Sequence, residues 1–251
     1  MAKAAGDPLI SVVVPTYNEE HYIGDLLESI KNQTCKNYEI IAIDSYSKDK
    51  TRSILKKYGA TVIKVPKSNI AAARNAGIKR AKGDIIAFID ADYVLSKHVF
   101  EGVVNMFSYD PLKKIAAIEP SPRVNNKDIK LRDRMKFRIL NSFVLLHKKI
   151  SFITMVPAAY GCVFCRASYV RKAGLFNEDL DVAEDKEYFL RIRKNGEFAM
   201  LEYPAKISYR RHAKEGMIKT NMLYLAATLS MLVFKKFKFK FRSIRRGKKG
   251  N

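Results

Sequence analysis

The feature that most constrains the fold of this chain is an alternation of short apolar runs and amphipathic segments over its first 120 residues. The apolar runs are rich in Ile, Val and Ala, and each has the length of a strand. Five strands are predicted, at Ile10–Thr16, Tyr38–Asp44, Thr61–Val65, Asp84–Asp90 and Ile115–Ser121. Four helices are predicted between them, at Glu20–Lys31, Lys48–Tyr58, Ile70–Ala81 and Lys97–Tyr109. This alternation is typical of an α/β fold with a mostly parallel central sheet flanked by helices.

The second half of the chain is less regular. A basic helical segment is predicted over residues 126–150, followed by a proline-containing loop at Ser151–Tyr160. The elements predicted beyond it are a strand at Gly161–Arg166, a helix at Glu184–Asn195, strands at Phe198–Tyr203 and Ile207–Arg211, and a helix at Met217–Phe234. No long linker is visible. The chain is therefore interpreted as one α/β domain over residues 8–214 and a basic helical appendage over 215–251.

Polar side chains follow three of the predicted strands at their carboxyl ends, where ligands of parallel α/β sheets bind. They are Thr16–Glu19, Asp44 and Asp90–Asp92, so all three groups are expected on one rim of the sheet. Side chains at i and i+2 of an extended chain point to the same face. The carboxylates of Asp90 and Asp92 should therefore converge, and a shared cation would relieve their repulsion. Mg²⁺ or Mn²⁺ carrying a diphosphate suits such an oxygen-rich site.

The charge of the chain indicates an anionic partner. Its 47 Lys and Arg residues outnumber its 25 Asp and Glu residues, which gives a net charge of +22. That surplus predicts attraction to a nucleic acid, an anionic membrane surface or a phosphorylated substrate, without choosing among them.

The three cysteines, Cys35, Cys162 and Cys165, form no disulfide framework and indicate a reducing compartment. Cys162 and Cys165 fall on opposite sides of a predicted strand, and no second pair completes a zinc site, so buried, inert thiols are expected. The N-terminus lacks the apolar core of a secretory signal. The longest largely apolar run, Met222–Phe234, has 13 residues. Spanning a bilayer takes roughly 20.

Five motifs occur in an order that resembles the family 2 glycosyltransferases of the A-type fold. They are Ser11-Val-Val-Val-Pro-Thr-Tyr-Asn-Glu19, Glu39-Ile-Ile-Ala-Ile-Asp44, Ala73-Arg-Asn-Ala-Gly77, Phe88-Ile-Asp-Ala-Asp92 and Ala183-Glu-Asp-Lys-Glu187. The resemblance implies that residues 8–214 are a catalytic domain that moves a hexose or N-acetylhexosamine from a nucleotide-diphosphate sugar to an acceptor hydroxyl or phosphate. It also implies inversion at the anomeric carbon and a Mn²⁺ or Mg²⁺ cofactor.

The resemblance assigns expected roles to single residues. Those expected to bind the nucleotide sugar are Pro15, Tyr17, Glu19, Asp44, Arg74, Asp90, Ala91 and Asp92. Tyr17 would lie near the base, Asp44 would hydrogen-bond the edge of the base, and Asp90 would lie on the ribose side. Asp92 would bind the metal directly, with Asp90 and His212 as further candidate ligands.

The general base of the reaction matches Asp185, with Glu184 beside it. An acceptor hydroxyl needs a base opposite the leaving diphosphate, and such proton transfer contributes ~10²–10⁴-fold. Both acids begin a predicted helix, where acids also serve simply to satisfy the helix start. Arg191 and Arg193 are candidates for contacting the diphosphate or the acceptor.

One motif departs from the family pattern. Family members often continue Asp-Gly-Ser after the acid that Asp44 matches, whereas this chain has Ser45-Tyr46-Ser47. The loss of the second acid and of the glycine leaves the base preference open, with uridine as first choice and guanosine as second.

The C-terminal appendage has the composition of a membrane-surface anchor. Residues 235–251 contain nine Lys or Arg and no acid, and they follow a predicted apolar helix. A second basic helix with an apolar stripe is predicted at Lys136–Ile150. The prediction is therefore a cytoplasmic enzyme, peripheral on the membrane, with a lipid-linked or membrane-presented acceptor. The alternative is a helix packed on the domain with a solvated tail.

Two other functions agree with parts of the sequence. A basic nucleic-acid-binding module would explain the charge but not an acidic rim, and no recognised binding motif is present, so no nucleic-acid partner is expected. A nucleotidyltransferase would also use Asp90 and Asp92 with a metal. It would release pyrophosphate instead of a nucleoside diphosphate.

Overall fold

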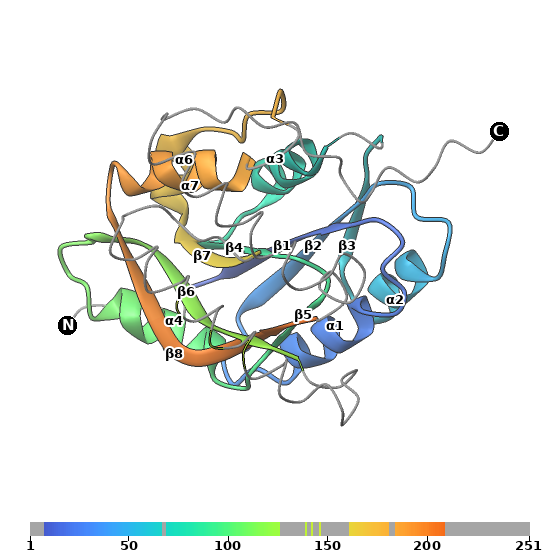
Figure 1. Cartoon of the computed structure of the whole chain (residues 1–251), viewed down its shortest axis with the longest axis horizontal. Helices are drawn as coiled ribbons and strands as arrows, with labels where there is room; N and C mark the ends of the chain where they lie inside the picture. The colour runs from blue at the N-terminus through green and yellow to red at the C-terminus, as the bar shows by residue number, and fades with distance from the viewer. Residues whose placement is uncertain are drawn as a thin grey trace.

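The computed structural model describes residues 8–66, 69–125, 161–180 and 184–208, together with Ile139, Ser142 and Leu146. These residues build one eight-stranded mixed sheet with the strand order β3-β2-β1-β4-β7-β6-β8-β5 (Figure 1). The predicted appendage over 215–251 and nearly all of the predicted basic helix over 126–150 lie outside the described residues.

The parallel half of the sheet contains β1 to β4. These strands are β1 (Ile10–Thr16), β2 (Tyr38–Asp44), β3 (Thr61–Lys64) and β4 (Ile85–Ile89). β1 lies between β2 and β4 and is parallel to both, and its last residue, Thr16, pairs with the last residue of β2, Asp44. The carboxyl ends of these strands therefore lie at one rim, as the sequence predicts.

The other half of the sheet is mixed. Its strands are β5 (Tyr93–Leu95), β6 (Ile115–Val124), β7 (Cys162–Arg166) and β8 (Glu197–Ile207). β7 is antiparallel to both β4 and β6, β6 and β8 are parallel, and β5 is antiparallel to β8. Four of the seven strand pairings are parallel, which agrees with the predicted fold class.

Helices cover both faces of the sheet (Figure 1). They are α1 (Ile23–Lys31), α2 (Thr51–Lys57), α3 (Ile70–Arg80), α4 (Val99–Ser108), α6 (Ala167–Ala173) and α7 (Glu184–Arg193). Successive strand residues alternate between two cores: Val12 and Val14 pack toward α1, α2 and α4, while Val13 packs toward α3, α6 and α7. Cys162 belongs to the first core and Cys165 to the second, which confirms that these thiols are buried on opposite faces.

The structure corrects the predicted elements in the second half. The strand predicted at Phe198–Tyr203 is part of β8, which continues through Pro204 to Ile207. Of the strand predicted at Ile207–Arg211, residues 209–211 lie outside the described residues. A register shift against β6 accommodates the proline, as a bulge does. β5 and α6 were not predicted. Among the described residues, none belongs to a helix long and apolar enough to cross a bilayer.

Candidate active site

Two loops at the carboxyl ends of β1 and β2, residues 17–22 and 45–50, are hydrogen-bonded to each other. Together they form a platform at one side of the rim. The Asn18 N–H donates to Ser47 Oγ (3.0 Å), and Asn18 Oδ1 accepts from the Lys48 N–H (2.8 Å). The Glu19 N–H donates to Thr51 Oγ1 (2.8 Å). The predicted nucleotide-binding residues Pro15 and Glu19 are buried in this platform, and Tyr17 is half-buried.

Asp44 lies beneath this platform and its side chain has no exposed surface. Its carboxylate accepts hydrogen bonds from the Ser47 N–H (3.0 Å), the Ser47 hydroxyl and the Thr16 hydroxyl (3.3 Å). Arg52 Nε lies 3.7 Å from Asp44 Oδ2. In this arrangement Asp44 shapes the loop after β2, and its oxygens are engaged within the protein. The side chain exposes no atom at the rim, and its contact with the edge of a base stays a prediction.

The backbone between Asp90 and Asp92 is not extended, contrary to the prediction. β4 ends at Ile89, and the Tyr93 N–H donates to the Asp90 carbonyl (3.2 Å), so residues 90–93 form a turn. The i, i+2 rule for extended chains therefore does not apply to this pair. Asp90 is instead oriented by Arg74, and Asp92 lines a cleft of about 180 Å³ together with His21, Tyr22 and Ser208. Ala91 is buried between them.

Arg74 joins the two acidic motifs. It is 3% exposed, its Nη2 donates to Asp90 Oδ1 (3.2 Å), and its Nη1 donates to Glu184 Oε1 (2.9 Å). Burial alone would lower the pKa of the guanidinium, but the carboxylates of Asp90, Glu184 and Asp185 raise it overall. Arg74 was predicted to contact the nucleotide sugar. The structure makes it a buried bridge that holds the end of β4 against the start of α7.

The rest of the α3 motif explains how Arg74 reaches this position. A Cβ at Gly77 would overlap Cγ1 of Val13 in β1, so only glycine lets α3 approach the strand this closely. Asn75 exchanges two hydrogen bonds with the backbone of Phe176, at 2.7 and 3.0 Å, and donates to Glu178 Oε1 (2.8 Å). α3 therefore positions the loop of residues 174–180 as well as the acidic cluster.

Gly161 is a site residue that the sequence reasoning assigned only to a strand. It is the residue before β7, its φ is +66°, and its carbonyl accepts from the Asp90 N–H (2.7 Å). A Cβ at this position would overlap Asp90 Oδ2 and lie 2.6 Å from Asp90 Cγ. The Asp90 carboxylate is thus held between Arg74 and the bare backbone of Gly161. A glycine at the start of an apolar strand was the only signal in the sequence.

The acids at the start of α7 differ in environment. Glu184 is 7% exposed, and burial, reinforced by the negative charge of Asp185, raises its pKa despite the ion pair with Arg74. Asp185 is half-buried, and its Oδ1 accepts from the Lys186 N–H (2.7 Å). Lys186 is itself buried, and burial lowers the pKa of its ammonium group. Glu184 is therefore buried against Arg74, and Asp185 is the more accessible carboxylate of the pair.

The predicted diphosphate contacts at the other end of α7 have different roles in the structure. Arg191 donates from Nε and Nη2 to the carboxylate of Glu187 (2.7 and 2.9 Å) and to the carbonyls of Ala173 and Leu175. Arg193 lies over the ring of Phe198, 5.5 Å from its centroid. The contacts of Arg191 fasten α7 to the end of α6 and to the residues that follow it, and Arg193 packs on β8.

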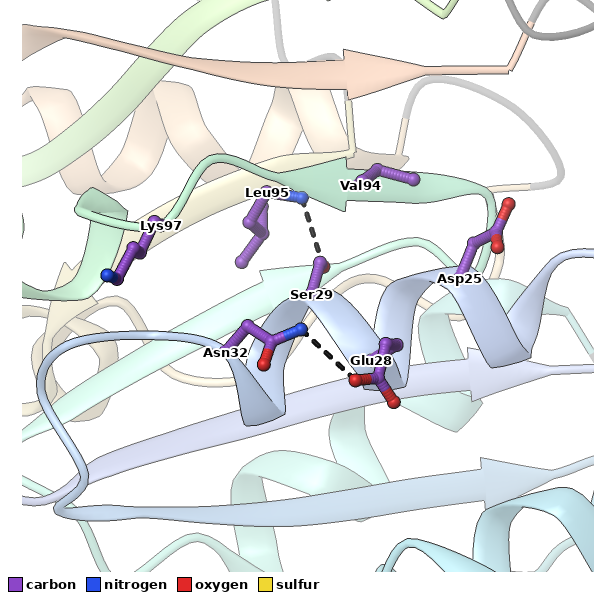
Figure 2. Close-up of a pocket in the computed structure, with 7 residues that line it drawn as sticks. All are labelled: Asp25, Glu28, Ser29, Asn32, Val94, Leu95 and Lys97. Carbon is purple, nitrogen blue, oxygen red and sulfur yellow. Dashed lines mark hydrogen bonds between the residues drawn. The ribbon is translucent and has the colours of Figure 1, made fainter.

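A larger hollow of about 540 Å³ lies between α1 and β5, and Figure 2 shows its lining. Ser29 Oγ accepts from the Leu95 N–H (3.0 Å) across it, and Asn32 Nδ2 donates to Glu28 Oε1 (3.1 Å). It meets the smaller cleft at Asp25 and Val94. Its lining contains none of the residues predicted for chemistry, so the smaller cleft beside Asp92 is the candidate active site.

The donor set at this cleft fits a hard divalent cation. Two carboxylates, those of Asp25 and Asp92, line the cleft together with His21, and Asp90 lies two residues before Asp92. Carboxylate oxygens suit Mg²⁺ or Mn²⁺, which complete their shells with water and substrate phosphate. No group of three His, Cys, Asp or Glu side chains in ligating position occurs among the described residues. His212, the third predicted ligand, lies outside them.

Comparison with known proteins gives a consistent family. The model of the family described as "Glycosyl transferase family 2" matches residues 11–173. The chain is 29% identical over 222 residues to a poly(ribitol-phosphate) beta-glucosyltransferase of Bacillus spizizenii, covering 77% of this chain and 34% of that protein. It is 29% identical over 198 residues to an uncharacterised glycosyltransferase of Rickettsia typhi, covering 74% and 59%. It thus spans about one third to three fifths of these relatives.

Solved structures share the fold. S. aureus TarS residues 1–349 in complex with UDP superpose with a TM-score of 0.61 at 20% identity, covering 88% of this chain and 65% of that one. The mannosyltransferase PcManGT from Pyrobaculum calidifontis, in complex with GDP-Man and Mn²⁺, gives a TM-score of 0.64 at 18% identity, covering 88% and 64%. These similarities confirm the predicted A-type glycosyltransferase fold.

Proposed function

Because this chain belongs to glycosyl transferase family 2, we propose that it transfers a sugar from a nucleotide-diphosphate sugar to an acceptor, with inversion at the anomeric carbon. A UDP-sugar is the first choice of donor and a GDP-sugar the second. The observation that carries the proposal is the pair of ion pairs made by Arg74, which hold Asp90 and Glu184 in one cluster. The neighbours of these acids, Asp92 and Asp185, are the proposed diphosphate-side acid and general base.

The proposed chemistry assigns one proton transfer to Asp185. Its carboxylate accepts the proton of the acceptor hydroxyl while the acceptor oxygen bonds to the anomeric carbon and the bond from that carbon to the diphosphate breaks. Glu184 is buried on Arg74 and acts by fixing the start of α7, so it is a positioning residue. A Mn²⁺ or Mg²⁺ ion held by Asp92 would neutralise charge on the departing diphosphate.

The donor is proposed to lie on the platform of the β1 and β2 loops, with its base near Tyr17 and its ribose on the side of Asp90. Support comes from the fold, since ligands of such sheets bind beyond the carboxyl ends of the strands. Among structures of the same fold, TarS was solved with UDP and PcManGT with GDP-Man.

The acceptor is proposed to be lipid-linked or presented at an anionic membrane surface. Residues 126–160 contain eight Lys or Arg and two acids, and residues 209–251 contain thirteen and one, so these segments carry +18 of the net +22. Each segment adjoins a residue that is hydrogen-bonded to the site. Gly161, which follows the first segment, accepts a hydrogen bond from the Asp90 N–H, and Ser208, which precedes the second, donates from its N–H to the Asp92 carbonyl (3.0 Å). Ile139 and Leu146, which have helical backbone, are 48% and 52% exposed.

A donor screen that measures nucleoside diphosphate release with Mn²⁺ and with Mg²⁺ tests the proposed reaction. Asp185→Asn should abolish turnover and leave donor binding by calorimetry largely intact, while Asp92→Ala should abolish metal-dependent turnover. Asp179→Asn, an exposed acid of the preceding loop, is the matched control and should keep activity. Full turnover in Asp185→Asn would end the assignment of the base, and release of pyrophosphate would identify a nucleotidyltransferase instead.

Membrane attachment has a separate test. Flotation of the full chain with anionic vesicles should show binding at low salt and weaker binding at high salt, because each basic residue near such a surface contributes about 1 kcal/mol. Absence of binding to anionic vesicles at low salt would contradict a membrane-presented acceptor without affecting the proposed transfer reaction.

A further inference from the structure

Tyr46 occupies an unusual backbone conformation at the rim of the site. Its φ is +55°, in the left-handed region that bulky residues rarely adopt. The other non-glycine residues with positive φ in the described part of the chain are Asn18 and Lys113. Asparagine tolerates this region, whereas tyrosine has no local compensation for it. Tyr46 is nevertheless 53% exposed, so burial of its ring in the protein does not explain the conformation.

The neighbours of Tyr46 impose its backbone. The Ser45 N–H donates to the Thr16 carbonyl (2.9 Å), and Ser47 is fastened to Asp44 through both its N–H and its hydroxyl. Strained conformations persist only where the surroundings determine them in this way, and they concentrate at functional sites. Here the fixed loop holds an aromatic side chain in solvent at the carboxyl end of β2.

We propose that Tyr46 is a specificity-determining residue of the donor site and that its ring stacks on the nucleobase. The inference rests on the proposed function. Asp44 has no exposed surface, so base recognition depends on groups that the two rim loops do expose. The hydrogen bond between Asn18 and Ser47 joins the residues that directly follow Tyr17 and Tyr46. The position is glycine in the pattern that this chain resembles, so the contact is a property of this chain.

Calorimetry with UDP, and separately with inorganic pyrophosphate, in the presence of Mg²⁺ tests the inference. Tyr46→Gly and Tyr46→Asn should weaken UDP binding about five- to hundredfold, the range that removal of one base–aromatic stack produces. Binding of pyrophosphate, which has no base, should be unchanged. Tyr46→Phe keeps the ring face and should bind UDP within about twofold of the wild type. The Tm of Tyr46→Asn should equal or exceed that of the wild type, because asparagine accepts the left-handed backbone.

Lys113→Asn is the matched control, since Lys113 has a φ of +52° and lies in the turn before β6. It should change Tm in the same direction and leave UDP binding unaltered. Wild-type UDP affinity in both Tyr46→Gly and Tyr46→Asn would overturn the inference, as would an equal loss of UDP and pyrophosphate binding. A wild-type protein that binds neither UDP nor GDP would instead overturn the proposed function.

Discussion

Two acidic sites at the rim of the sheet are stabilised in different ways. Asp44 is satisfied mainly by its own loop and by the adjacent strand, through Ser47 and Thr16, and it has Arg52 nearby. Asp90 and Glu184 instead share one guanidinium, that of Arg74, which lies 16 and 110 residues away along the chain. The first site is local and its partners are mostly neutral donors, while the second is long-range and ionic.

The two sites differ in their balance of charge. Around Asp44 the hydrogen bonds account for both carboxylate oxygens, and the side chain is shielded from solvent. Around Arg74 three carboxylates face one cation, and the pKa of Glu184 is raised as a result of burial and of Asp185. Perturbed, unevenly balanced groups of this kind are where proton transfer and cation binding occur. The comparison therefore separates an acid that shapes the loop after β2 from the acidic cluster beside which the proposed general base lies.

The largest expected effect comes from removing the shared cation. Arg74→Ala leaves the buried carboxylate of Glu184 and the partly exposed carboxylate of Asp90 without their partner. It should lower the free energy of unfolding by about 3–5 kcal/mol, with loss of transfer activity. Arg52→Ala, at a side chain 37% exposed, should cost about 1 kcal/mol or less. Urea unfolding monitored by circular dichroism measures both. An equal loss of unfolding free energy in the two variants would contradict the distinction between a hydrogen-bonded site and an ionic site.

A smaller effect should follow from displacing Asp90 without removing any charge. Gly161→Ala places a methyl group against the Asp90 carboxylate and should reduce kcat by about 10²-fold, the scale expected for a displacement of ~1 Å at a reacting site. Gly59→Ala is the matched control, because Gly59 also has a positive φ, +73°, and its Cβ would meet nothing within 4 Å. Steady-state kinetics and Tm distinguish the two. A similar loss of activity in both variants would assign the effect to backbone strain alone.

A third expected effect is a dependence of stability on pH. The pKa of Glu184 is raised from its ordinary value of 4.5 to about 7, so the folded protein holds a proton that the unfolded chain releases between these values. Stability should therefore fall as pH rises from about 4.5 to 7 and level off above it. Glu184→Gln should remove this component of the decline, measured as Tm against pH for both proteins. Parallel curves for the two proteins would show that Glu184 is ionised throughout and that the ion pair with Arg74 dominates.

The parallel half of the fold could be predicted from the sequence because its signals are local. The bounds of β1 and β2 agree with the prediction at both ends, since apolar, β-rich runs end at Thr16 and Asp44. β5 was missed because it has three residues and is stabilised by pairing with β8, over a hundred residues later. α6 follows β7 directly, with no turn residue to mark its start.

The identity of the site residues could be predicted better than their contacts. The rim position of Asp44, Asp90 and Asp92 followed from strand ends, and that placement is confirmed by the sheet. The engagement of Asp44 by Ser47, and of Arg191 by Glu187, depends on rotamers and on neighbours that a sequence pattern does not specify. The turn at residues 90–93 likewise overrode the period-two argument for the two acids.

Helix α3 makes three structural contacts, and they restrict which of its residues can be substituted. This helix rests on Val13 through Gly77, binds the acids through Arg74 and fixes the loop before α7 through Asn75. A shift of α3 would move its contact with β1, the acids bound by Arg74 and the loop before α7 together. Substitutions at these three places are therefore coupled. The segment after β2 depends chiefly on its own hydrogen bonds. Under the proposed function, exchange of a few residues there would change the donor site while the ion pairs of Arg74 stay in place.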